Sequence, residues 1–158
     1  MNNNTSHATI AEYFRLGLMV GLIEQHQAVT WADSVIAASD NPSPEIIELA
    51  WSSDLQATLT ALSAVPGERD SQQAGHWLLG LLASNIPPQI ERLNITTQCA
   101  MRIAQIADLG EDTYYRFDNI DDELSLAKQK IYGTEEECRV ALLAELSEFH
   151  PLQLNNVA

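Results

Sequence analysis

The sequence predicts an all-α fold: a single domain of about eight short-to-medium helices, arranged as a helical bundle or as an array of helical hairpins. Apolar residues recur at spacings of three and four along most of the chain, which is the period of one helix face. Leu and Ala together supply 39 of the 158 residues and Val only six, a balance that favours helix over strand. No run alternates polar and apolar residues for long enough to predict a strand.

Four helices are expected in the first half of the chain, joined by short polar connections. They cover residues 8–23, 26–39, 44–51 and about 55–62. Thr5 or Ser6 is expected to cap the first helix, and Ser53 or Asp54 the fourth. The third helix is predicted to begin at Ser43-Pro44, because a capping residue is followed there by the residue preferred at the first helical position.

Four more helices are expected after a loop at residues 65–70. They cover about 71–86, 95–108, 120–132 and 135–149. Asp70 or Ser71 is expected to cap the first of them, and Gly110 to end the second in a left-handed conformation. Thr134 and Glu137 have the spacing of a capping box at the start of the last helix.

The domain is expected to cover residues 8–150, between a disordered N-terminal tail at 1–7 and a C-terminal tail at 151–158. One internal echo favours the hairpin-array arrangement: residues 44–49 and 88–93 share the pattern P-x-I-x-x-L, 44 residues apart. That distance suits repeats of two helices.

The net charge of the chain indicates which classes of partner it can bind. The formal net charge is −14, with 22 acidic and eight basic side chains. Phosphate binding needs clustered Lys and Arg, so neither nucleic acid nor an anionic membrane is expected as a partner. A basic protein is the partner that such a field attracts, although the charge could also serve only solubility.

The sequence also predicts where the protein resides. The longest apolar run, residues 16–23, is too short to span a membrane. The first 14 residues contain no Lys or Arg, so no signal peptide is expected and the chain is predicted to be cytoplasmic.

No catalytic, cofactor-binding or metal-binding motif is present, so no catalytic residue, cofactor or metal is predicted. The chain lacks the phosphate-binding, nucleophile-elbow and His-Glu-x-x-His patterns, and its four histidines are far apart in the sequence. Residues 118–123 resemble the start of a calcium loop only superficially. Ile120 stands where an oxygen ligand is required, and Glu123 where Gly is needed for the turn.

The most unusual segment is residues 108–123, which hold seven acidic side chains and only one base, Arg116. Residues 111–119 are predicted to form an ordered loop or a short turn of helix, and residues 118–123 to begin the next helix. Two interpretations are open: the carboxylates favour the positive end of that helix, or they surround exposed aromatics in a surface for a basic partner. The second interpretation gives the candidate partner-binding residues, Tyr114, Tyr115, Asp118, Asp121, Asp122 and Glu123.

The two cysteines, Cys99 and Cys138, fall among Ile and Leu at helical spacing. Both are expected to be reduced and buried as small apolar residues, rather than to act in redox chemistry or as nucleophiles.

Three stretches resemble small, acidic, mostly helical bacterial proteins, some of which are immunity proteins of contact-dependent and other polymorphic toxin systems. They are LGLMVGLI at 16–23 with VTWAD at 29–33, PEIIEL at 44–49, and IDDELSLA at 120–127 with IYG at 131–133. The resemblance covers about a quarter of the chain and lies in packing and capping positions. It implies a cytoplasmic inhibitor that binds a toxin domain, in many such systems a nuclease with a basic groove.

The first functional hypothesis is therefore a non-catalytic immunity protein that binds and neutralises a cognate basic toxin domain. The second is a helical adaptor or scaffold with another protein partner, and the third is an enzyme or small-ligand binder. A conserved concave pocket with converging polar groups would favour the third.

Overall fold

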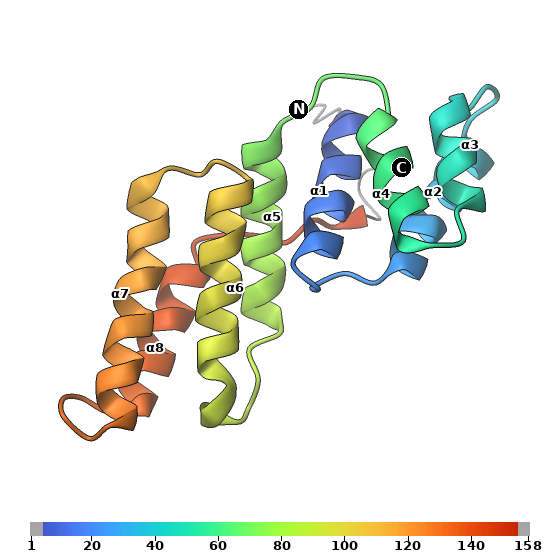
Figure 1. Cartoon of the computed structure of the whole chain (residues 1–158). Helices are drawn as coiled ribbons and strands as arrows, with labels where there is room; N and C mark the ends of the chain where they lie inside the picture. Colours follow the sequence, from blue (N-terminus) through green and yellow to red (C-terminus); the bar gives the residue numbers. More distant parts are fainter. Residues whose placement is uncertain (1–4, 155–158) are drawn as a thin grey trace. The chain divides into compact units, whose positions relative to one another are not determined.

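The computed structural model describes residues 5–154 and is built from helices, which confirms the all-α prediction. It contains eight α-helices and one 3₁₀ turn within that range, and no strand (Figure 1). The chain divides into two compact units, residues 1–74 with 153–158, and residues 75–152. None of the described helices is both long and apolar enough to cross a bilayer.

The first unit contains α1 (His7–Met19), α2 (Gln25–Ala38), α3 (Pro44–Trp51) and α4 (Leu55–Ala64). Helix α4 packs against both α1 and α3, and α2 packs against α3. In the core, the rings of Phe14 and Trp31 stack with centroids 5.4 Å apart. Ile46, Leu49 and Leu62 are also fully buried in this unit.

Local capping rules predict the helix starts of this unit well. The side chains of Ser6, Ser43 and Asp54 each accept a hydrogen bond from a backbone amide of the first turn. The first helix is nevertheless shorter than the predicted 8–23. It ends at Met19 because Gly21 adopts a φ of +76°, and Ile23 then packs against Gly17.

Helix α5 (Ser71–Ser84) begins in the first unit and contributes residues 75–84 to the second. Asp70 caps it, because its Oδ1 accepts the backbone N–H of Gln73 at 3.0 Å. The helix ends before the two prolines, as predicted. Within the second unit, Gly80 lies against the backbone of His150 and Pro151.

The rest of the second unit is a 3₁₀ turn (Ile90–Arg92) followed by α6 (Leu93–Ile106), α7 (Glu111–Lys128) and α8 (Glu135–Leu146). Helix α7 packs along both α6 and α8. Phe117 and Leu124 of α7 are buried against this core, with Ile103 of α6 and Leu146 of α8.

The prediction of an ordered loop or a short turn of helix at 111–119 is wrong, since this segment is the first half of the continuous 18-residue helix α7. Phe117, Ile120, Leu124 and Ala127 form its buried face, which begins inside the stretch assigned to the loop. Gly110 does not end α6: it precedes α7 with a φ of +94°, whereas Asp108 has the left-handed φ of +54°. Residues 118–123 therefore lie in the middle of a helix.

The buried face of helix α6 determines how far Cys99 is enclosed. Leu93, Thr96, Thr97, Ala100, Ile103 and Ala104 are buried, whereas Ile95 is exposed. Cys99 is consequently only half-buried, which corrects its predicted burial, while Cys138 is buried as expected. Both cysteines are free thiols.

Two further expectations for the second half need correction. The helix predicted at 120–132 ends at Lys128, and the last helix ends at Leu146. Phe149 instead stacks on His76 with ring centroids 5.3 Å apart. The echoed pattern is not a structural repeat either, because residues 44–49 belong to an α-helix whereas residues 88–93 pass through the 3₁₀ turn.

The predicted tails fall largely outside the described residues, which exclude 1–4 and 155–158. Of the described part, Ser6 caps α1 and His7 begins it.

Candidate protein-binding surface

Helix α7 carries all six residues predicted to bind a partner. Successive residues of an α-helix are rotated by about 100°, so five of the six fall within an arc of about 120° on one side of α7. These five are Tyr114, Tyr115, Asp118, Asp121 and Asp122, which we call the α7 face. Glu123 lies on the opposite flank, where its negative charge helps to raise the pKa of Cys138 on α8. The structure therefore brings five of the six together and separates the sixth.

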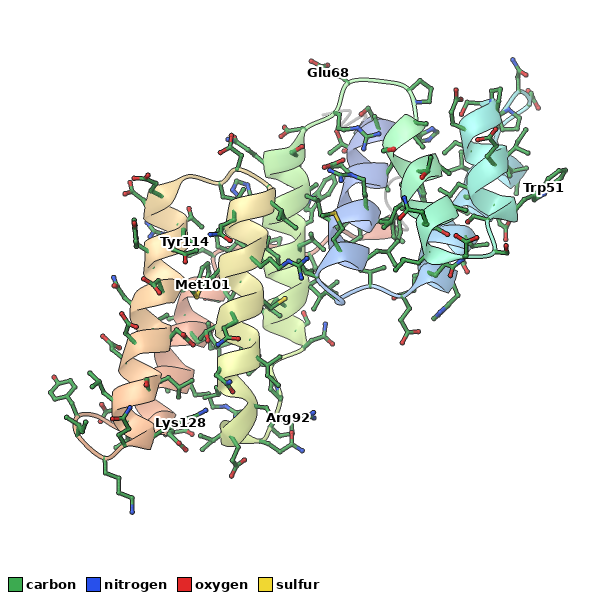
Figure 2. The ribbon with its side chains drawn as sticks, viewed as in Figure 1. Trp51, Glu68, Arg92, Met101, Tyr114 and Lys128 are labelled. Carbon is green, nitrogen blue, oxygen red and sulfur yellow. The ribbon has the colours of Figure 1, made fainter. Side chains whose placement is uncertain are left out.

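The two tyrosines lie at the N-terminal end of the α7 face. Their rings meet edge to face with centroids 5.4 Å apart, and Tyr115 is 52% exposed. Tyr114 is half-buried and is labelled in Figure 2. An exposed tyrosine offers apolar area together with a polar tip, which is the combination that protein interfaces favour.

The three aspartates of the α7 face differ in their surroundings. Asp121 has a structural contact, because its Oδ1 accepts a hydrogen bond at 2.6 Å from the hydroxyl of Thr97, a fully buried residue of α6. Asp118 is half-buried and Asp122 is exposed. No ion pair between either of these two and a described cation is present. Asp118 and Asp122 are therefore the carboxylates available to a partner.

Arg116, the one base of the segment, is directed away from the α7 face. Its Nη1 lies 3.7 Å from a carboxylate oxygen of Glu145, in the last turn of α8, and 3.4 Å from one of Glu148, just after that helix. It consequently does not neutralise Asp118 or Asp122, and the α7 face keeps its negative charge.

A second group of charges, in the first unit, was not foreseen from the sequence. The carboxylate of Glu12 is buried and accepts hydrogen bonds from Arg15 and, at 2.6 Å, from Arg69. Burial raises the pKa of Glu12, but the hydrogen bonds and charges of the two arginines outweigh it and leave the pKa below its usual value. Arg69 also donates to the carbonyls of Leu62 and Val65 at the end of α4.

Arg15 and Arg69 are the only Lys or Arg residues in the first unit, which holds nine acidic side chains. Both pair with Glu12, and no other described carboxylate of the unit forms an ion pair with a lysine or arginine of that unit. Acidic side chains therefore outnumber arginines in this unit by nine to two, and its formal charge is strongly negative.

The first unit also carries the most exposed tryptophan of the described chain. Trp51, the last residue of α3, is 82% exposed and projects from the ribbon in Figure 2. It lines an open hollow of about 620 Å³ between α3 and α4. The remaining lining residues are Glu48, Ser52, Ser53, Asp54, Gln56, Ala57, Thr60 and Ala61.

The exposure of Trp51 is not predictable from the sequence, because an aromatic at the end of an amphipathic helix is usually a core residue. In the part of the chain that the structure describes, no three His, Cys, Asp or Glu side chains lie close enough together to hold a metal ion.

Comparisons with protein families, with curated proteins and with solved structures find no match for this chain.

Proposed function

We propose that this chain is a non-catalytic protein-binding protein of the immunity type, which binds a cognate basic toxin domain in the cytoplasm and neutralises it. The observation that carries the proposal is the α7 face, where exposed Tyr115 lies beside carboxylates that no described cation neutralises. Tyrosine supplies contact area at low entropic cost, and the carboxylates supply charge complementarity.

The inhibition would be steric and electrostatic. The net charge of −14 draws a basic domain toward the protein and raises the association rate. Asp118 and Asp122 then form ion pairs with Lys or Arg side chains of the toxin. The ring of Tyr115 packs against the toxin surface next to these ion pairs. If the toxin is a nuclease, those cations are the ones that hold its phosphate substrate, so the bound protein excludes the nucleic acid.

The test begins with the product of the gene adjacent to this one in its native genome. That product is expressed in a susceptible host with and without the present chain. We expect the product alone to arrest growth and the chain to restore it. Growth arrest that the chain leaves unchanged would contradict the immunity proposal.

The role of the α7 face is tested on the purified complex. Asp118→Asn/Asp122→Asn removes two charges and retains side-chain shape; Asp121 is left intact because Thr97 donates to it. We expect the association rate to fall a few-fold at low salt and its salt dependence to weaken. Asp33→Asn/Asp40→Asn removes the same charge from exposed sites in the first unit and serves as the control. Equal effects of the two pairs would rule out a specific α7 face.

A helical adaptor is the second candidate, and one observation favours it. Exposed aromatic residues lie on both compact units, Trp51 on the first and Tyr115 on the second, as would suit a protein that joins two partners. A stable complex with the adjacent product that gives no growth protection would favour this function over immunity.

A further inference from the structure

We propose that the hollow between α3 and α4 is a docking site for an arginine side chain on the surface of a protein partner. In this site the guanidinium stacks on the indole of Trp51 and pairs with Glu48 and Asp54. The site belongs to the first unit and does not rest on the function proposed for the α7 face.

Trp51 is the anchor of this site. It is 82% exposed, so nearly its whole ring is available to a ligand. The face of an indole carries negative electrostatic potential and is the best aromatic partner for a cation, and arginine stacks on it with its planar guanidinium. Tryptophan is also among the residues most enriched at the energetic centres of protein interfaces.

The charges around the ring select a cation. Glu48 precedes Trp51 by three residues on α3, so the two side chains are neighbours on one helix face. Asp54 lies on the other side of the hollow, at the start of α4. Phosphate groups would be repelled from this site, which disfavours a nucleic acid as the occupant.

Among the described residues of the first unit, no lysine or arginine forms an ion pair with Glu48 or Asp54. Arg15 and Arg69, the two bases of the first unit, are both paired with Glu12. The carboxylates of Glu48 and Asp54 therefore remain to be matched by a cation from another molecule, and arginine matches both the charge and the aromatic ring.

The backbone of the site is held in place before any partner binds. The hydroxyls of Ser52 and Thr58 lie 2.8 Å apart, and Thr58 is fully buried. Ser52 Oγ also lies 2.7 Å from the carbonyl of Leu49, and Oδ1 of Asp54 accepts the backbone N–H of Ala57 at 2.8 Å. A preorganised site loses little conformational entropy on binding. The lining also includes the small side chains Ala57, Thr60 and Ala61, which take up little of the space that an arginine stem would need.

The test uses the whole chain and a defined probe, the peptide acetyl-Gly-Arg-Gly-Arg-Gly-amide, titrated at low salt. The readout is the NMR signal of the Trp51 indole N–H, assigned with Trp51→Phe. We expect a saturable shift of this signal. The same peptide with citrulline in place of arginine keeps the shape and removes the charge, and we expect it to bind at least about tenfold more weakly.

Matched variants locate the binding. Glu48→Gln/Asp54→Asn removes the two charges, and Asn retains the helix cap that Asp54 provides. We expect this pair to weaken binding by about tenfold, while Asp33→Asn/Asp40→Asn changes it by less than about twofold. Thermal unfolding confirms that each variant is folded.

Two results would overturn the inference. One is equal binding of the arginine and citrulline peptides, which would indicate a neutral ligand. The other is equal weakening by both pairs of substitutions, which would indicate diffuse charge attraction. Asp118→Asn/Asp122→Asn should leave the Trp51 signal and its titration unchanged, so failure here and failure of the α7 face are separate outcomes.

Discussion

Replacing Glu12 with Gln should destabilise the first unit strongly, although the two side chains have nearly the same shape. The carboxylate is 2% exposed and is paired with two arginines, Arg15 and Arg69, that are 29% and 23% exposed. Removing one member of a buried ion pair typically costs about 3–5 kcal/mol, because the remaining charge is left without a partner. Here both guanidinium groups retain access to water, and Arg69 keeps its backbone carbonyls. We therefore expect Glu12→Gln to lower the free energy of unfolding by about 2–4 kcal/mol.

Native-state hydrogen exchange is the appropriate assay, since it reports on each helix separately. In Glu12→Gln, the amides of α1 and α4 should lose protection. Asp33→Asn, an exposed site on α2, should change stability by less than about 0.5 kcal/mol. A loss below about 1 kcal/mol in Glu12→Gln would refute the reasoning, because it would mean that the carboxylate contributes no more than an exposed ion pair does.

The same substitution predicts a pH dependence with a defined sign. The pKa of Glu12 is lowered in the folded protein, so its contribution is complete above the unfolded pKa of about 4.3. That contribution to stability is lost as the pH falls through the lower pKa that Glu12 has in the folded protein. The stability difference between the natural chain and Glu12→Gln should therefore narrow as the pH is lowered from about 5 to about 3, and a constant difference would contradict the assignment.

Two further predictions concern the second unit. Gly80→Ala should lower its thermal stability by about 1–3 kcal/mol, because a Cβ there would collide with the backbone of the segment that follows α8; an unchanged melting temperature would show that this segment can move aside. In alkylation by iodoacetamide, Cys99 should react before Cys138, although burial raises the pKa of both thiols. Cys138 is the more enclosed of the two, and Glu123 and other nearby carboxylates further disfavour its thiolate. The single variants Cys99→Ala and Cys138→Ala identify each rate, and faster reaction of Cys138 would contradict the burial seen here.

The helix starts could be predicted from the sequence because capping is local. Ser43, Asp54 and Thr134 each bond to an amide three residues later, so the sequence contains both partners of the interaction. The full length of helix α7 cannot be predicted in this way, because Tyr114, Tyr115 and Phe117 lie too close together in the sequence to indicate a single buried face. Only Phe117 is buried, and this selection depends on the neighbouring helices.

The tertiary features of the candidate sites could not be predicted in the same way. Arg69 pairs with Glu12 across 57 residues, and nothing in either local sequence identifies the other. The exposure of Trp51 depends on how α3 packs against its neighbours, which apolar spacing alone does not specify. The acidic character of α7 was visible from the sequence, whereas the inward contact of Asp121 with Thr97 was not.

Because α7 is one uninterrupted helix, its aspartates repel one another along one side, and this repulsion affects the free energy of binding. Asp118 and Asp122 are four residues apart on one helix, and Asp121 is three residues from Asp118, so like charges face one another along the same side. Each such pair weakens a helix by about 0.2–0.5 kcal/mol. A cation placed between these carboxylates would relieve their mutual repulsion, so the free energy of association would include a stabilisation of α7 itself. A basic partner that pairs with these carboxylates would thus make α7 more stable in the complex than in the free protein.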